Sequence, residues 1–231
     1  MWVWPRADAR VPKFVDHAKR RDEIALVACR VVAIYGFEQA TVARIAKETG
    51  YTTGMIAHYY ESKQEIVLAS LRLILRRIEE RLGNHSDEPE GLLAVLAEAL
   101  PLDAQRRTEC AFWTAFWGQV STDRRLKRIN AWVHREYLRL FERCLATHWP
   151  QWATWPENLR HTTLRSVVTF INGITASAVA SQSEWPAERQ MEQLKLQLDL
   201  LHRHASEVVG SDLEHLRRNS SGRVTRRVAA I

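Results

Sequence analysis

The chain has 231 residues, a formal net charge of +6 at pH 7, 46% hydrophobic residues and 26% charged residues. This composition is that of a globular protein with one or two domains, and it excludes a disordered chain. No apolar run reaches the roughly 18 residues that a membrane span needs, and residues 1–20 hold no continuous apolar segment of a secretory signal. We therefore expect a cytoplasmic protein with no membrane partner. The cysteines, Cys29, Cys110 and Cys144, lie far apart in apolar helical patterns, which predicts reduced core residues.

The positive charge is distributed unevenly along the chain. Residues 1–65 carry ten basic and eight acidic side chains, and residues 66–215 carry 18 and 19. Residues 216–231 carry five arginines and no acid. The excess therefore lies in a C-terminal tail, which we expect either to be disordered or to add contacts to nucleic acid. Net charge alone does not identify a DNA-binding protein.

Apolar residues recur with the period of a helix along the whole chain, and no strand alternation stands out. A small residue, a capping residue or a proline separates each periodic segment from the next. The capping box Ser62-Lys-Gln-Glu65 opens the fourth segment. The expected helices are 16–35, 41–49, 52–60, 63–82, 91–100, 103–120, 123–147, 157–181 and 187–209.

We thus predict an all-α fold of about nine helices in two lobes. The front lobe is a three-helix domain, and the helix that begins at Lys63 leads into a larger helical domain. The expected divisions are an N-terminal arm 1–13, a front domain 14–62, a second domain 63–209 and the basic tail 210–231.

Residues 41–60 have the spacing of a helix-turn-helix. Ala46 permits a close helix crossing, Gly50 permits a tight turn with positive φ, and Ile56 packs into the crossing. The second helix of such a unit enters the major groove, where hydroxyl and thioether groups contact base edges and basic or phenolic groups reach phosphates. A helical hairpin that only packs is the alternative. The candidate DNA-binding residues are Thr41, Thr52, Thr53, Met55, His58, Tyr59 and Lys63.

The run from Ala40 to Leu68 resembles the N-terminal domain of the TetR/AcrR family of bacterial transcriptional regulators, and in particular its BetI-like branch. Tyr51 departs from the family pattern, in which a small aliphatic residue is usual. The residues that carry the resemblance are Thr41, Ile45, Ala46, Gly50, Thr52, Thr53, Gly54, His58, Tyr59, Tyr60 and Lys63.

This resemblance implies a homodimer that binds a palindromic operator in double-stranded DNA, usually as a repressor released by a small-molecule effector. It also implies that the last two large helices, 157–181 and 187–209, form the dimer contact. Their composition suits this role, because small residues on the first permit close approach and leucines recur on the second. Ordinary packing within one chain is the alternative. The candidate interface residues are Gly173, Ser177, Ala180, Leu194, Leu198 and Leu201.

Nine tryptophans are many for this length, and the segment Phe112-Trp113-x-x-Phe116-Trp117 places aromatic rings along one helical face. The resemblance and the aromatic spacing predict a cavity for an effector, either apolar or a quaternary ammonium held by cation–π contacts. A solid core is the alternative. The candidate ligand-binding residues are Trp113, Phe116, Trp117 and Trp132. Trp149, Trp152 and Trp155 form a second group, compatible with a lid, a dimer rim or a hydrophobic plug.

No metal-binding, phosphate-binding or nucleophile motif occurs in the sequence, so we predict no enzyme activity, no metal and no cofactor. The leading hypothesis is a dimeric, ligand-responsive DNA-binding transcriptional regulator. The second is a small-molecule-binding helical protein whose front lobe does not read DNA.

Overall fold

The computed structural model describes the backbone of residues 16–84 and 91–228, and the side chains of residues 16–83 and 91–211 within them. This part of the chain contains helices and no strand, which confirms the predicted all-α class. The elements are α1 (His17–Tyr35), α2 (Val42–Thr49), α3 (Thr53–Tyr59), α4 (Lys63–Asn84), α5 (Leu92–Ala97), α6 (Ala104–Val120), α7 (Arg124–His148), a 3-10 turn (Trp152–Thr154), α8 (Glu157–Ala180) and α9 (Ala187–Val228).

Side-chain caps fix where most of these helices begin. An Asp or Thr oxygen just before the helix accepts a hydrogen bond from a free backbone N–H of the first turn. The capping side chains are Asp16 for α1, Thr41 for α2, Thr52 for α3, Asp103 for α6 and Asp123 for α7.

The capping box at the start of α4 differs in one bond from the expected arrangement. The backbone N–H of Glu65 donates to the Ser62 hydroxyl oxygen over 3.3 Å, as predicted. The Glu65 carboxylate, however, accepts from the backbone N–H of Glu61, at 2.9 Å, and not from that of Ser62. The box therefore also secures the residue that joins α3 to α4.

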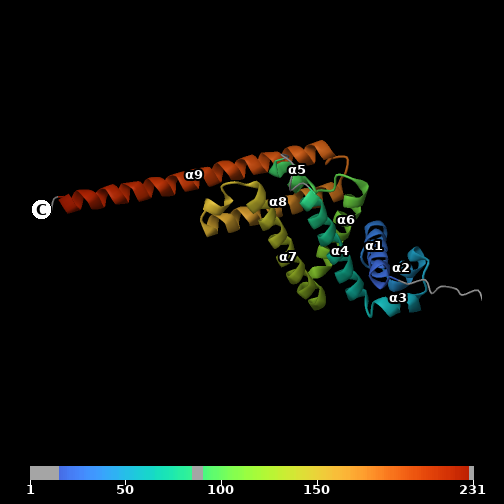
Figure 1. The fold of residues 1–231 in the computed structure, drawn as a ribbon. Coiled ribbons are helices and arrows are strands. Elements are labelled where there is room, and N and C mark those ends of the chain that lie inside the picture. The colour runs from blue at the N-terminus through green and yellow to red at the C-terminus, as the bar shows by residue number, and fades with distance from the viewer. Residues whose placement is uncertain (1–15, 85–90, 229–231) are drawn as a thin grey trace, which may run out of the picture.

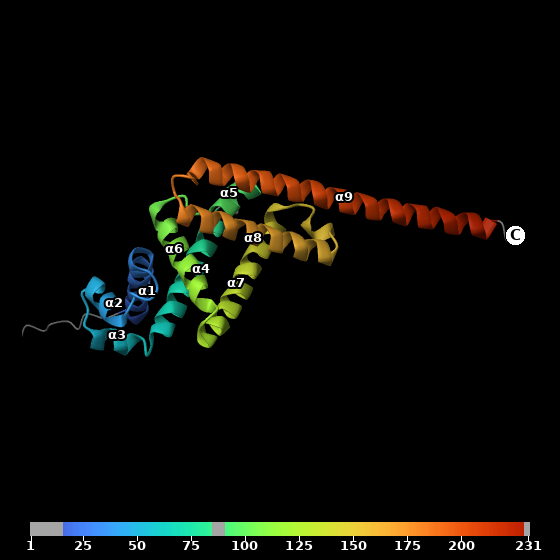
Figure 2. The same cartoon turned by 180° about the vertical axis from the view of Figure 1, so that it is seen from behind.

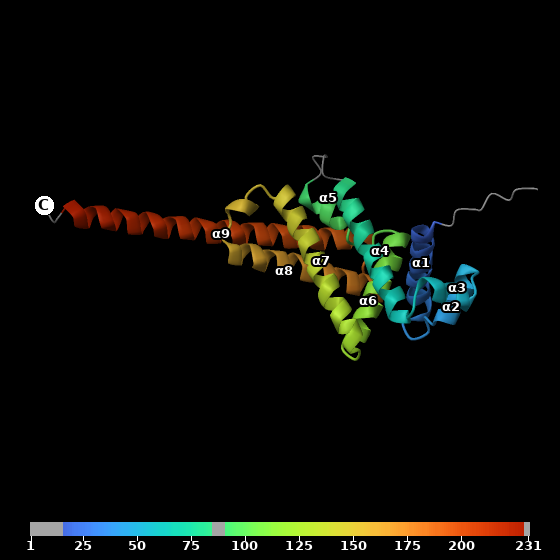
Figure 3. The same ribbon diagram turned by 60° about the horizontal axis from the view of Figure 1, so that its bottom comes forward.

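The helices form two parts joined by α4 (Figures 1 and 2). Helices α1, α2 and α3 lie together at one end, and α4 runs from them into a bundle with α6, α7 and α8. Helix α9 lies along α8 and over α5. Helix α1 packs against both α4 and α6, so the front part contacts two helices of the bundle (Figure 3).

A buried serine ties α1 to α4. The Ser70 hydroxyl is fully buried, and it is within hydrogen-bonding distance of the Ala25 carbonyl of α1 (3.1 Å) and the Ile66 carbonyl one turn earlier in α4 (2.9 Å). A polar group that bridges two helices in an apolar interior favours one relative height, because sliding would break its contact with the Ala25 carbonyl and leave that end of the bridge unmade.

The second tryptophan group is a hydrophobic plug. Trp149, Trp152 and Trp155 are all buried, and their ring centroids lie 4.9 to 6.4 Å apart. The Trp149 ring also lies 5.8 Å from that of His202 in α9. The connection from α7 to α8 is thereby packed against the last helix.

The last helix is longer than the sequence analysis predicted. We expected a helix that ended near residue 209 and then a basic tail, either disordered or in contact with nucleic acid, whereas α9 continues to Val228. Residues 210–228 contain no proline, and extending an existing helix needs no new nucleation step. The arginine-rich segment is carried past the bundle and away from α1–α3 (Figure 1).

Candidate DNA-binding surface and effector cavity

The turn between α2 and α3 has the geometry of a helix-turn-helix. Gly50 takes the left-handed conformation with φ of 72°, which favours glycine. The Tyr51 N–H donates to the Ala46 carbonyl over 2.9 Å, so the chain reverses within one turn of the helix end. Ala46 and Ile56 are buried at the crossing. The predicted roles of these three positions are confirmed by the structure.

Two arginines and a glutamate of α1 hold both ends of α3. At its start, the Tyr51 hydroxyl donates to the Glu23 carboxylate over 2.7 Å, and Arg20 donates to the same hydroxyl. At its end, Arg21 donates to the Tyr59 carbonyl, and its guanidinium lies 4.3 Å from the centre of the Tyr60 ring. Helix α3 is therefore fixed on the rest of the front part although it has only seven residues.

The outer face of α3 presents small and polar side chains. Thr53, Ala57 and His58 are exposed, and Met55 is half-buried. Thr52 is exposed too, and its hydroxyl oxygen accepts from the Met55 N–H at 3.1 Å, which leaves its proton free to donate. Short side chains on a supported helix are compatible with close approach to base edges.

Tyr59 and Lys63 do not lie as predicted. Tyr59 is only 7% exposed, because its ring packs beside those of His17 and His58, so the prediction of an exposed Tyr59 is wrong. The Lys63 ammonium donates to the Phe37 carbonyl at 2.6 Å, and burial lowers its pKa. In this conformation both residues hold the front part together.

Ala57 was missed in the sequence analysis. It follows Thr53 by four residues and thus lies on the same helix face, and the structure shows both exposed. The helical spacing could have identified Ala57, but its methyl side chain has no polar group that would suggest a contact with DNA.

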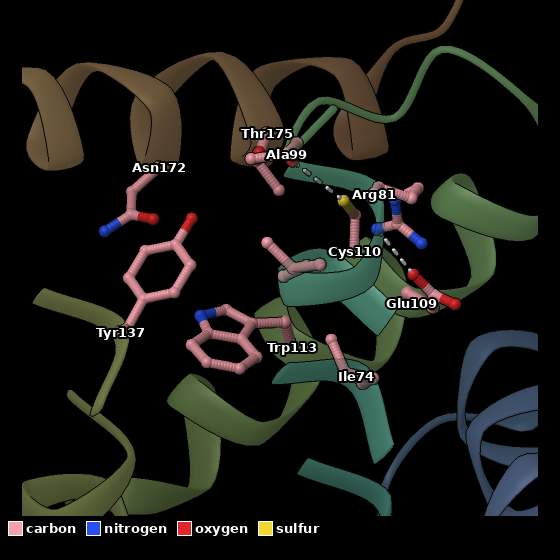
Figure 4. Close-up of a pocket in the computed structure, with 10 residues that line it drawn as sticks. Ile74, Arg81, Ala99, Glu109, Cys110, Trp113, Tyr137, Asn172 and Thr175 are labelled. Atoms are coloured by element: carbon pink, nitrogen blue, oxygen red, sulfur yellow. Dashed lines mark hydrogen bonds and ion pairs between the residues drawn. The ribbon is translucent and has the colours of Figure 1, made fainter. Parts of the chain in front are cut away.

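A small cavity of about 20 Å³, with room for about one water molecule, lies between α4, α6, α7 and α8 (Figure 4). Of the four predicted ligand-binding residues, only Trp113 lines it. Phe116 is fully buried in the core, the Trp117 ring packs edge-on against Trp113 at 5.9 Å, and the Arg72 guanidinium lies over the Trp132 ring. The lining residues are Ile74, Ile78, Arg81, Ala99, Glu109, Cys110, Trp113, Tyr137, Asn172 and Thr175.

One end of the cavity is formed by buried ion pairs. The Glu109 carboxylate is 4% exposed, and it pairs with Arg77 at 3.0 Å and Arg81 at 3.1 Å, both from α4. Arg81 also lies 3.6 Å from Glu98, which in turn pairs with Arg106 at 3.0 Å. The sequence signal for this network was Glu109, a glutamate within an apolar helical pattern. The sequence analysis did not identify the network, because the arginines that pair with Glu109 lie far from it along the chain.

The other end carries polar groups of aromatic and amide side chains. The Tyr137 hydroxyl points toward Asn172, and the indole nitrogen of Trp113 lies on the same side (Figure 4). The centroids of the Trp113 and Tyr137 rings are 5.3 Å apart. Burial raises the pKa of Tyr137, so its hydroxyl stays protonated and can donate. This end can therefore form hydrogen bonds to a ligand.

Only some of the predicted interface residues lie on the outer face of α8 and α9. Gly173 and Ala180 are exposed and Ser177 is half-buried, whereas Leu194 and Leu198 are buried in the core of their own chain. The interface prediction is wrong for these two leucines, because the core side of α9 takes them. Leu201 is half-buried, and Leu196 and Leu200 are 50% and 46% exposed.

A groove with a volume of about 620 Å³ runs between α8 and α9 on this outer face, and Gly173 and Ser177 line it. Among the described residues, no three His, Cys, Asp or Glu side chains are grouped as a metal ion would require. None of the helices that were described is long and apolar enough to span a bilayer.

Comparison with known proteins identifies the family. Residues 24–70 match the model described as bacterial regulatory proteins, tetR family, and residues 89–203 match that of the BetI-type transcriptional repressor, C-terminal. PksA, a transcriptional regulator of Bacillus subtilis, is 31% identical over 110 residues, which are 46% of this chain and 54% of PksA. BetI of Yersinia pestis is 27% identical over 145 residues, which are 58% of this chain and 73% of BetI.

Solved structures share the fold. A Rhodococcus transcriptional regulator superposes with a TM-score of 0.68 at 23% identity, over 80% of this chain and 97% of that one. A Saccharomonospora viridis transcriptional regulator in complex with choline gives a TM-score of 0.66 at 16% identity, over 79% and 96%. The chain belongs to the TetR family of bacterial regulators, with a C-terminal part of the BetI type. The matched families and relatives are transcriptional regulators and not enzymes.

Proposed function

We propose that this protein is a DNA-binding transcriptional repressor that binds a palindromic operator as a homodimer and is released by a small-molecule effector. The observation that carries the proposal is the support of α3 by α1. Hydrogen bonds from Tyr51 and Arg21 fix a short helix whose outer face presents Thr53, Ala57 and His58. A rigid helix with small polar side chains is what reading a major groove requires.

The outer face of α8 and α9 supports a dimer. Leu196 and Leu200 are two of the four exposed large hydrophobic residues among those described, and both lie on α9. Gly173 and Ala180 on α8 leave room for another helix to approach. Two copies joined here would present two α3 helices, and a palindromic operator mirrors such a two-fold arrangement.

The position of the small cavity beside α4 supports control by an effector, whose binding would have to widen it. Ile74, Ile78 and Arg81 line it from α4, which is also the helix that begins next to α3. A ligand that binds one tilt of α4 better than another shifts the protein toward that tilt. Two α3 helices must meet half-sites about 34 Å apart, so a small tilt in each subunit breaks their match to DNA.

The test is binding of the purified protein to the DNA upstream of its own gene, measured by gel shift at physiological salt. We expect sequence-specific binding that Thr53→Ala and His58→Ala each weaken about tenfold. The melting temperature should stay unchanged in Thr53→Ala, whose side chain is exposed, and should fall only slightly in His58→Ala, whose ring also packs beside Tyr59. Lys195→Glu, an exposed change on α9, is the control and should bind as the wild type does. Binding that is indifferent to DNA sequence, or unaffected by both α3 variants, would favour a helical small-molecule-binding protein that does not read DNA.

A further inference from the structure

The start of α1 lies beside the end of α3. The imidazole ring of His17, the first residue of α1, lies 5.9 Å from that of His58 and 5.6 Å from the Tyr59 ring, measured between ring centres. Both histidines are exposed, whereas Tyr59 is buried beside them. Because His58 belongs to the outer face of α3, this contact brings the side chain of His17 to the end of the face that we propose meets DNA.

The two imidazoles can bind one anion together. Their planes are inclined by 52°, so the rings are not stacked face to face. A neutral imidazole has one N–H donor, and the cationic form has two. The oxygens of a phosphate point in different directions, so one phosphate can accept from two neighbouring exposed rings.

No carboxylate neutralises either histidine among the described residues, where His161, 4.0 Å from Glu157, is the only histidine within ion-pairing distance of one. The Asp16 carboxylate accepts from the Lys19 N–H, and that of Glu65 accepts from the Glu61 N–H. Three cations and three carboxylates surround the pair, so any excess of positive charge must come from the histidines themselves. The charged and titratable groups around the pair are Asp16, Lys19 and Arg21 at the start of α1, Tyr59 of α3, Tyr60 and Glu61 after it, and Glu65 and Arg72 of α4.

Covering the Tyr59 ring is the alternative role of His17. A ring that only covers a neighbour needs no charge, and phenylalanine could replace it. A phosphate contact depends on charge, and histidine is the side chain whose charge ordinarily changes between about pH 5 and pH 8. The two roles therefore predict different responses to pH and to salt.

We propose that His17 and His58 together bind one phosphate of the operator backbone, so that His17 positions α3 in the major groove. Contacts to phosphates fix the orientation of a protein on the duplex and read no base. Because the protonated imidazoles attract the phosphate, operator affinity rises as the pH falls. This inference rests on the proposed function, since it adds a backbone contact to the same DNA-binding surface.

The experiment measures operator affinity of the full-length protein by fluorescence anisotropy at about pH 6 and about pH 8. We expect the wild type to bind about tenfold more tightly at the lower pH. His17→Phe keeps a ring beside Tyr59 but loses the charge, and should reduce this ratio to about threefold. His17→Lys keeps a cation at both pH values, so it should also have a smaller ratio but bind about threefold more tightly than His17→Phe at the higher pH.

The salt dependence gives a second measurement of the same contact. Each neutralised phosphate releases counterions, so at about pH 6 the slope of log affinity against log salt should be shallower by about 0.9 in His17→Phe and unchanged in His17→Lys. His134→Phe, which replaces an exposed histidine of α7, is the matched control and should keep the pH ratio and the salt slope of the wild type. The melting temperature of each variant verifies that its fold is intact.

The outcomes separate this inference from the function on which it rests. If His17→Phe keeps the pH ratio and salt slope of the wild type, whatever its affinity, His17 only covers Tyr59 and the phosphate contact is overturned, while operator recognition stands. Wild-type binding without sequence preference would instead contradict operator recognition. The phosphate contact is then tested by the same ratio and slope on that binding, because phosphate contacts do not depend on base sequence.

Discussion

The Tyr51 hydroxyl donates a 2.7 Å hydrogen bond to the Glu23 carboxylate, and this bond joins the turn before α3 to α1. Tyr51 is the residue at which the sequence departs from the family pattern, and the structure shows what the larger side chain does. It anchors the start of the candidate recognition helix at a point where a small aliphatic residue could not reach α1.

Tyr51→Phe tests this anchor. Both partners are partly exposed, so we expect a loss of roughly 0.5–1 kcal/mol in the free energy of unfolding, and a fall of about threefold in operator affinity as α3 becomes less constrained. Urea denaturation and gel shift measure the two effects. An unchanged operator affinity would show that Tyr51 does not position α3.

The same bond predicts a pH dependence. It is the main cause that lowers the pKa of Glu23 from its ordinary value of 4.5. A carboxyl whose pKa is lower in the folded state stabilises the protein above its unfolded pKa, and this stabilisation disappears as the pH falls through the folded value. The stability difference between wild type and Tyr51→Phe should therefore shrink below about pH 4.5.

Tyr59→Phe and Thr53→Ala should separate packing from DNA contact. The Tyr59 ring is buried beside His17 and its hydroxyl has no hydrogen-bond partner among the described residues, so Tyr59→Phe should change operator affinity less than about twofold. The exposed Thr53 should matter about tenfold for affinity and little for stability. Titration of each variant with labelled operator DNA gives the comparison. A large loss with Tyr59→Phe would place its hydroxyl at the DNA after all.

Glu109→Gln should destabilise the fold. The change leaves Arg77 and Arg81 without their buried carboxylate, and because these arginines are 23% and 20% exposed we expect a loss of about 2–3 kcal/mol. Glu79→Gln breaks an ion pair whose side chains are 59% and 63% exposed and should cost less than about 0.5 kcal/mol. Urea denaturation measures the free energy of unfolding of the two variants. Equal values would show that the ion pairs of Glu109 do not stabilise the fold more than the exposed pair does.

The three described thiols should react slowly in the folded protein. Burial raises the pKa values of Cys29, Cys110 and Cys144 to about 12, so little thiolate exists at pH 8. A colorimetric thiol reagent should label them within minutes only after denaturation. Cys110 lines the cavity, so a bound effector should protect it further. Rapid native labelling of all three would contradict their burial.

Leu200→Glu should disrupt the dimer. The side chain is 46% exposed on the outer face of α9, and a charge there opposes burial against a second copy. Light scattering after size-exclusion chromatography should give a monomer, whereas Lys195→Glu, also exposed on α9, should remain dimeric. If Leu200→Glu stays dimeric, the interface lies elsewhere.

Local patterns in the sequence predicted most of the helices and the turn at Gly50, because caps, glycines and apolar spacing act within a few residues. They did not predict that Tyr59 and Leu194 are buried or that Trp132 lies outside the cavity. Those outcomes depend on neighbours such as His17 and Arg72, which are distant in sequence and close only after folding. The ion pairs of Glu109 were missed for the same reason.

Helix α4 can convert a small rotation at the cavity into a larger displacement at the DNA-binding end of the molecule. Ile78 at the cavity and Lys63 at the start of the helix are 15 residues apart, which is about 22 Å along the axis at the usual rise of an α-helix. If α4 turned by about 5° around Ile78, its far end would move by about 2 Å, more than half of the spacing between stacked base pairs in each subunit. A ligand of a few atoms that changes the angle of α4 at the cavity would thus displace the start of the helix, next to α3, by a much larger distance.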